Sequence, residues 1–79
     1  MKRMTNNYRV DRASEAVSPP CGMNSVLYAG DNYHAAMHVF NYTEGGKDAW
    51  NQPDRNCGVM LSLWNSDKQM YVAKRWKNK

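Results

Sequence analysis

The sequence has no long apolar run, and we expect no secretory leader. No segment approaches the ~20 consecutive apolar residues that a membrane-spanning helix needs. Residues 1–7 are basic and lack the apolar stretch of a signal peptide. We therefore expect a cytoplasmic protein that does not associate with membranes.

The chain contains two cysteines, Cys21 and Cys57. Because thiols are kept reduced in the cytoplasm, we interpret both as small, reduced and partly buried side chains. The alternative is a disulfide. It would close a long loop and stabilise a small domain by a few kcal/mol, but it requires an oxidising compartment.

Catalytic and metal-binding patterns are also missing. Glu15 and Glu44 are the only glutamates, and nothing pairs them as general acid and base. His34 and His38 would share one side of a helix, but Ala35 stands where the zinc-protease pattern HExxH needs glutamate. We expect two solvated histidines, no metal, no cofactor and no enzymatic activity.

What is present fits one small folded domain. The chain has 79 residues, of which 42% are apolar, too many for a disordered protein of this charge. We predict a single domain over residues 1–79, with 1–7 and 77–79 as flexible tails. The net charge of +4 is uneven, since residues 1–12 carry +3, residues 74–79 carry +4 and the middle carries −3. The basic ends would form one patch if they met.

Four segments show the periodicity of regular structure. Apolar and polar residues alternate over residues 8–12, which predicts a short edge strand. Residues 13–17 either extend this strand or form a helical turn. Residues 18–22 contain two prolines and a glycine and predict a break, and residues 24–29 predict a strand that ends at Gly30. Asp31 is a good N-cap for a helix over 32–42. The apolar stripe of that helix is Tyr33, Ala36, Met37 and Phe40, widened by Val39.

The C-terminal quarter predicts a β-hairpin with two different faces. A two-residue turn at Ser66-Asp67 would pair Leu63 with Met70 and Leu61 with Val72. Alternation along the strands then separates a core face from an amphipathic face. The core face carries Val59, Leu61, Leu63, Met70, Val72 and Trp76, and the second face carries Met60, Ser62, Trp64, Tyr71, Ala73 and Arg75.

The sum is an α+β fold, a small antiparallel sheet with one helix packed on one face, in the order β-(β)-α-β-β. One helix covers one face, so the second hairpin face is left for another partner or for residues 1–17 to cover. The long polar connection over 44–56 is a second candidate for contact, with a helical turn at 47–50.

Two functions fit these features. The first is protein binding, because aromatic residues, Met and Arg are enriched in interface cores; a homodimer would use the same face. The second is single-stranded nucleic-acid binding, with bases stacked on the sheet and cations on phosphates. The residues for the first are Met60, Trp64, Tyr71, Arg75, Trp50 and Lys74; those for the second are Trp64, Tyr71, Arg75, Lys77, Arg9 and Arg12.

The order of a strand at 25–30, a helix at 31–43 and strands at 58–64 and 70–76 resembles small bacteriophage accessory proteins, such as anti-CRISPR and host-takeover inhibitors. The resemblance lies in element order, with no motif that would carry binding residues across. It implies a non-enzymatic protein that binds one host complex in the host cytoplasm. The positive charge departs from the acidic DNA mimics of that group and suits an acidic surface or a nucleic-acid-binding groove on a host protein.

Overall fold

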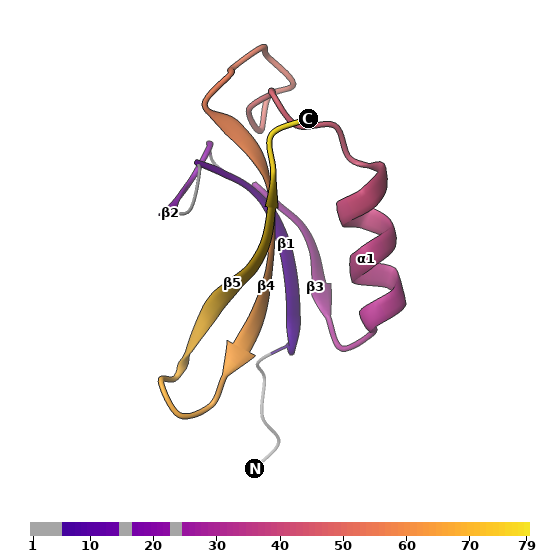
Figure 1. Cartoon of the computed structure of the whole chain (residues 1–79), viewed down its shortest axis with the longest axis vertical. Helices are drawn as coiled ribbons and strands as arrows, with labels where there is room; N and C mark the ends of the chain where they lie inside the picture. Colours follow the sequence, from indigo (N-terminus) through magenta and orange to yellow (C-terminus); the bar gives the residue numbers. More distant parts are fainter. Residues whose placement is uncertain (1–5, 15–16, 23–24) are drawn as a thin grey trace.

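An antiparallel sheet with one helix on one face forms the body of the molecule, as predicted (Figure 1). The computed structural model describes residues 6–14, 17–22 and 25–79. Every strand pair in the described residues is antiparallel. The elements are β1 (Tyr8–Ser14), β2 (Val17–Pro20), β3 (Val26–Gly30), α1 (Tyr33–Tyr42), β4 (Cys57–Asn65) and β5 (Met70–Lys77).

Strand β1 lies inside the sheet, so the prediction of an edge strand is wrong. It pairs along its whole length with β4, from Tyr8 opposite Leu63 to Ser14 opposite Cys57. Its other edge is shared by β3, which pairs with the first half, and β2, which pairs with Ala13 and Ser14. Side chains on both faces of β1 are therefore buried: Val10, Asp11 and Ala13.

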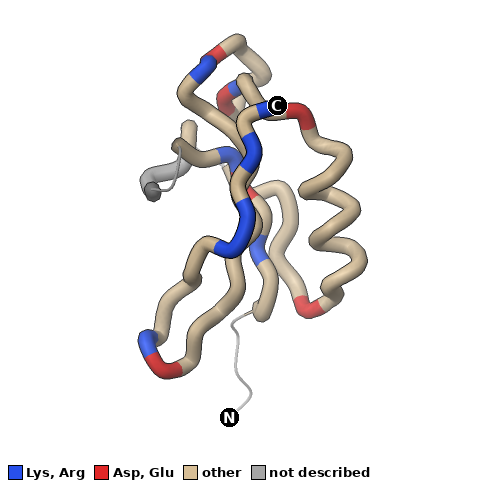
Figure 2. The backbone as a smooth tube through the Cα atoms, in the orientation of Figure 1, with Lys and Arg blue, Asp and Glu red and all other residues tan. Residues whose placement is uncertain are grey.

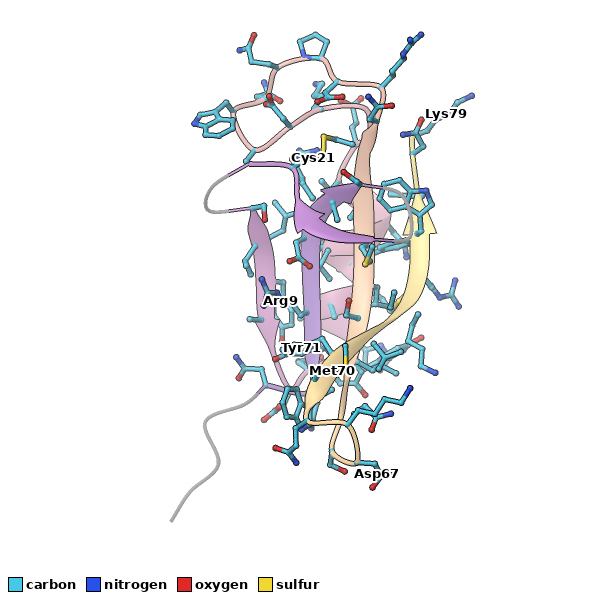
Figure 3. The ribbon with its side chains drawn as sticks, turned by 90° about the vertical axis from the view of Figure 1, so that its left-hand side faces the viewer. Arg9, Cys21, Asp67, Met70, Tyr71 and Lys79 are labelled. Carbon is cyan, nitrogen blue, oxygen red and sulfur yellow. A yellow bond between two sulfur atoms is a disulfide. The ribbon has the colours of Figure 1, made fainter. Side chains whose placement is uncertain are left out.

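Residues 17–20 form a strand where the two prolines predicted a break. The pairing with β1 is short and irregular, with Ser14 opposite Val17 and Ala13 opposite Pro20. A strand that pairs on one side only tolerates proline, because an edge strand does not need every N–H for its ladder. β2 lies on the side of the sheet away from α1 (Figures 1 and 3).

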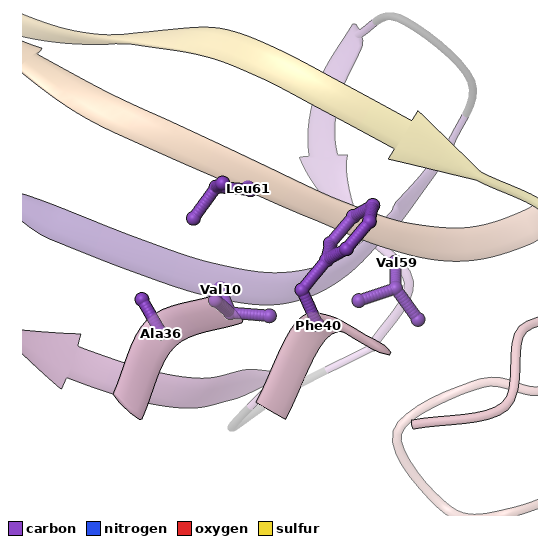
Figure 4. Packing of buried hydrophobic residues seen from close by; sticks show 5 residues of the cluster. All are labelled: Val10, Ala36, Phe40, Val59 and Leu61. Carbon is purple, nitrogen blue, oxygen red and sulfur yellow. The ribbon is translucent and has the colours of Figure 1, made fainter. Parts of the chain in front are cut away.

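Helix α1 begins one residue later than predicted. Its N-cap is Asn32, whose Oδ1 accepts a hydrogen bond from the N–H of Ala35 at 3.0 Å. Asp31 instead accepts from the N–H of Asn7 at 2.9 Å and so holds the chain that leads into β1. The predicted apolar stripe is largely confirmed, although Tyr33 at its start is exposed. Figure 4 shows the resulting core, in which Ala36 and Phe40 pack against Val10, Val59 and Leu61.

The turn between β4 and β5 is longer than the predicted two residues. Asn65 pairs with Met70, which leaves residues 66–69 as the turn. The side chain of Asn65 accepts from the N–H of Lys68 at 2.9 Å, and Gln69 adopts a left-handed φ of 55°. Asparagine side chains stabilise such turns by satisfying backbone donors.

A β-bulge changes the faces of the last residues of β5. The register shifts between Leu61, which pairs with Arg75, and Ser62, which pairs with Ala73, so Lys74 is the extra residue. Trp76 therefore lies opposite Met60 on the second face, and Arg75 lies opposite Leu61 on the helix side. Both placements reverse the prediction, because an inserted residue exchanges the two faces beyond it.

The two cysteines are joined in a disulfide, so the prediction of reduced thiols is wrong. Their Cα atoms lie 5.9 Å apart, a usual separation for this bond. The pairing explains the contact: Ser14 lies opposite both Cys57 on β4 and Val17 on β2, and Cys21 follows β2. The N–H of Cys21 donates to the carbonyl of Arg12 at 3.1 Å, which returns the chain to β1.

Candidate interaction surface

The residues predicted to form one surface lie in separate parts of the molecule. Met60 is 7% exposed and belongs to the interior of the sheet, so it is not available to a partner. Trp64 and Tyr71 remain neighbours on the second face. Lys74 and Arg75 lie exposed along β5, and Trp50 lies in the connection between α1 and β4.

Arg9, Trp64 and Tyr71 form an aromatic cluster on the second face, of which Figure 3 labels Arg9 and Tyr71. The rings of Trp64 and Tyr71 meet edge to face with centroids 5.2 Å apart. Arg9 Cζ lies 5.6 Å from the Tyr71 centroid, and the Tyr71 hydroxyl donates to the carbonyl of Asn6 at 2.6 Å. These contacts fasten the start of β1 to the hairpin and leave the aromatic cluster half-buried.

The charge of Arg9 is partly neutralised within the fold. Arg9 Nε lies 3.0 Å from Asp11 Oδ2, and the carboxylate is almost buried. Burial raises the pKa of Asp11 above its usual 3.8, and the charge and hydrogen bond of Arg9 oppose that rise without cancelling it. Arg9 thus compensates a buried carboxylate and is a poor candidate for phosphate binding.

Two further cations proposed for nucleic acid bind backbone carbonyls instead. Arg12 Nη1 donates to the carbonyls of Glu44 at 2.8 Å and Lys47 at 3.3 Å. Lys77 Nζ donates to the carbonyl of Asn41 at 3.0 Å and lies 5.3 Å from the Phe40 ring centroid. Both therefore hold the end of α1 and the following segment against the sheet.

Lys77 and Asn78 were predicted to lie in a flexible tail, but both are held by the fold. Lys77 is the last residue of β5, and the side chain of Asn78 donates to the carbonyls of Arg55 and Cys57 at 3.0 and 3.1 Å. Residues 1–5, including Lys2 and Arg3, lie outside the described part of the chain, as do 15–16. One prediction was that residues 1–17 fold over the second sheet face. Of these residues, 8–14 and 17 belong to strands β1 and β2 of the sheet, and 1–5 and 15–16 lie outside the described part.

The connection over 44–56 is a closely hydrogen-bonded loop, and we call it the Trp50 loop. The predicted helical turn is absent; Lys47 and Pro53 form a bridge, and Asn51 at the tip has a left-handed φ of 63°. The carboxylate of Asp48 accepts from the N–H groups of Trp50 and Gln52 at 2.9 and 3.0 Å. One acidic side chain therefore fixes the tip.

The base of the Trp50 loop is fixed to the body of the fold. The N–H of Ala49 donates to the carbonyl of Cys21 at 2.9 Å, and that of Gly46 to the carbonyl of Cys57 at 2.8 Å. The disulfide joins these two acceptor residues. Lys47 also pairs with Glu44 at 3.0 Å, and this hydrogen bond and charge lower the pKa of Glu44. These contacts hold the loop, and with it the tip that carries Trp50, in a fixed position.

Trp50 is 60% exposed on this rigid loop. It is held along one edge, because a Cβ added to Gly22 would lie 2.6 Å from Trp50 Cζ3. Gly22 also has a φ of 115°, which favours glycine. Among the residues whose side chains the structure describes, the other large exposed apolar side chains are spread over β3, α1 and β5: Val26 and Leu27, Tyr33 and Tyr42, and Met70.

A pocket of about 390 Å³, which no pattern in the sequence predicts, lies beside the end of β5. The described residues that line it come from three distant segments, brought together by strand pairing and the bulge. They are Ser14, Arg55, Asn56, Trp76 and Asn78.

The two histidines lie on the exposed side of α1. The His38 ring packs on Tyr42 with centroids 4.6 Å apart, and His34 contacts Tyr33. Across the described ranges, no group of three His, Cys, Asp or Glu side chains is close enough to hold a metal ion. Those ranges also contain no helix with the length and apolar character needed to cross a membrane.

Comparison with known proteins returns no relative. No protein-family model matches the chain, and neither the curated proteins nor the solved structures contain a match.

Proposed function

We propose that this protein is a non-enzymatic binding module whose main contact is the Trp50 loop. The observation that supports this is a tryptophan 60% exposed on a loop that Asp48, the Cys21 carbonyl and the disulfide hold in place. Tryptophan is among the residues that most often dominate binding energy. A loop that is ordered before binding loses less conformational entropy in the complex.

The proposed partner is a host protein or host complex, which the protein inhibits or modulates in the manner of bacteriophage accessory proteins. The element order that resembles those proteins supports this proposal, and the basic β5 favours an acidic partner surface. We place the action in the host cytoplasm. An oxidising compartment is the competing location, because the disulfide would have to persist against cytoplasmic reductants.

The experiment is affinity capture from bacterial lysate treated with nuclease, using wild type, Trp50→Ala and Tyr42→Ala. Tyr42 is a matched control because it is also a highly exposed aromatic, 79% exposed, on α1. We expect one protein partner to be lost with Trp50→Ala, retained with Tyr42→Ala, and an unchanged thermal midpoint in both variants.

A Trp64→Ala variant separates the Trp50 loop from the second sheet face. Loss of the partner in Trp64→Ala with retention in Trp50→Ala would contradict a contact centred on the Trp50 loop. Nucleic-acid binding by the sheet face is the alternative. It has less support, since Arg12 and Lys77 bind carbonyls and Arg75 lies on the helix side. It would appear as oligonucleotide binding that weakens steeply with salt and is lost in Trp64→Ala.

A further inference from the structure

The pocket beside the end of β5 combines groups that the proposed protein contact does not use. Ser14 ends β1, Arg55 and Asn56 precede β4, and Trp76 and Asn78 lie at the end of β5. Its volume of about 390 Å³ falls in the range of small-molecule sites. Of the described residues that line it, Ser14, Arg55, Asn56 and Asn78 are polar and Trp76 is aromatic.

Arg55 is held in place by its backbone while its side chain stays available. Its carbonyl accepts from Asn78 Nδ2 at 3.0 Å, and the neighbouring Asn56 N–H donates to Asp54 Oδ1 at 3.0 Å. The guanidinium makes no hydrogen bond or ion pair with the residues that the structure describes, and Arg55 is exposed. A fixed backbone with a free guanidinium suits a phosphate, which arginine binds with two parallel hydrogen bonds.

Trp76 supplies a planar apolar wall. The bulge at Lys74 brings it onto the second face, where its indole lies against the β4 backbone at Gly58: a Cβ added there would be 2.5 Å from Trp76 Cη2. Packing of this kind fixes the ring before any ligand arrives. Indole rings stack on nucleobases regardless of the base, because every base has an aromatic face.

The electrostatic surroundings favour an anion. Residues 68–79 contain five lysines and arginines and no acidic residue. Figure 2 shows the basic positions along β5 and at the C-terminal end, while Lys68 lies in the turn before β5. Lys77 is held by the Asn41 carbonyl and Arg75 lies on the helix side, which leaves the exposed Lys74 and Lys79 as the further positive charge on this end of the chain.

We propose that this pocket binds a nucleoside phosphate, with the base against Trp76 and the phosphate on Arg55. Asn56, Asn78 and Ser14 line the same pocket. The side-chain nitrogen of Asn78 already donates to two backbone carbonyls and Ser14 Oγ lies 3.6 Å from Cys21 Sγ, so the Asn56 amide and the carbonyl oxygen of Asn78 are the groups that can pair with polar edges of the ligand. A carboxylate of an acidic peptide would satisfy Arg55 but leave the Trp76 wall unused. The proposal is independent of the partner bound by the Trp50 loop.

The test is a titration of the ¹⁵N-labelled protein, followed by ¹H–¹⁵N correlation spectra, with AMP, adenosine, inorganic phosphate and 5′-phosphorylated oligo(dT). We expect AMP to shift the Trp76 indole N–H and the Arg55 and Asn78 signals, with the Trp50 indole unmoved. Adenosine and phosphate should each bind more weakly than AMP, because each supplies one half of the contact. Shifts confined to the Trp50 loop or the aromatic cluster would overturn the proposal.

The matched variants are Arg55→Gln and Arg75→Gln, which remove the same charge inside and outside the pocket. Both residues are exposed, so both variants should keep the folded spectrum. We expect Arg55→Gln to weaken AMP binding about tenfold or more, since charged hydrogen bonds are lost, and Arg75→Gln to change it little. Equal weakening by both variants would indicate binding by net charge alone and would overturn the site.

The oligonucleotide arm identifies the source of the nucleotide. Equal affinity for AMP and oligo(dT) indicates a free nucleotide; much tighter and salt-dependent oligo(dT) binding indicates a nucleic-acid strand whose end or base enters the pocket. Displacement by a glutamate-rich peptide, with no shift by AMP, would assign the pocket to an acidic protein and refute the nucleotide. The two proposals are tested separately with the opposite variants. Arg55→Gln should still capture the protein partner, and Trp50→Ala should still bind AMP.

Discussion

Asp11 is a single residue whose burial lowers the stability of the folded protein. Its carboxylate is nearly buried on β1, a strand paired with both β3 and β4, and Arg9 offsets only part of the desolvation, so its pKa is raised. A raised folded pKa means that the native state binds its proton more tightly than the unfolded chain. The stabilising effect of that proton is present below pH 3.8 and is lost as the pH rises through the folded pKa.

We therefore predict that Asp11→Asn raises the free energy of unfolding at neutral pH. The variant should also lack the wild-type loss of stability above pH 3.8, because asparagine carries no charge to desolvate. Urea unfolding at a series of pH values from about 3 to 7 measures both effects. Glu44, whose pKa is lowered, acts with the opposite sign and is unchanged in the variant. A less stable Asp11→Asn protein at neutral pH would mean that pairing with Arg9 outweighs burial.

At the level of elements, α1 depends on its cap because it has ten residues and no acidic side chain in its first turn. Asn32→Ala removes the acceptor of the Ala35 N–H, and we predict a loss of about 1 kcal/mol in the free energy of unfolding. Asn41→Ala is the matched control at an exposed position inside the same helix, where alanine favours the helix. Chemical denaturation of the two variants measures the difference. Equal stability would show that packing of Phe40 and Ala36 alone fixes the start of α1.

The elements also show how far periodicity predicts this fold. Alternation located β1, short apolar runs and turn residues located β3, β4 and β5, and the apolar stripe located α1. The bulge at Lys74 leaves no such pattern: an extra residue in one strand exchanges the faces of Arg75 and Trp76 without changing the composition. The position of β1 inside the sheet was missed because it depends on pairing with β4, about fifty residues away.

The candidate sites were predictable to different degrees. Trp50 was named from its place in a long polar connection, although its rigid presentation depends on contacts with Cys21 and Gly22 that no local pattern shows. The pocket was missed because Ser14, Arg55 and Trp76 meet only through strand pairing. The aromatic cluster was predicted as a surface pair, but its contact with Asn6 needed the three-dimensional position of β1.

For the whole molecule, the disulfide is the main covalent constraint. It joins residues 36 apart in the sequence, and closing such a loop stabilises the native state by about 4 kcal/mol in the chain-entropy model. We predict a loss of that order on reduction of the wild-type protein, or in the double variant Cys21→Ala/Cys57→Ala. Denaturant unfolding with and without a reductant measures it, and the double variant should no longer respond to the reductant.

Alkylation of free thiols in intact cells, followed by mass measurement, is the matching test of compartment. Unreactive cysteines in native protein that become reactive after reduction would establish the bond in the cell. Two reactive thiols in the native protein would contradict the disulfide and favour a reducing cytoplasm.

The central place of β1 has a consequence for the order in which the chain can fold during synthesis. Val10 cannot pair with Leu61 on β4 until the ribosome has added the intervening residues, and this synthesis takes roughly 3 to 10 s at usual rates of elongation. During that interval β3 and β2 can occupy one edge of β1, but the other edge has no partner. The nascent chain therefore exposes an unpaired strand edge to chaperones, and to neighbouring copies on the same messenger RNA, until its last quarter emerges.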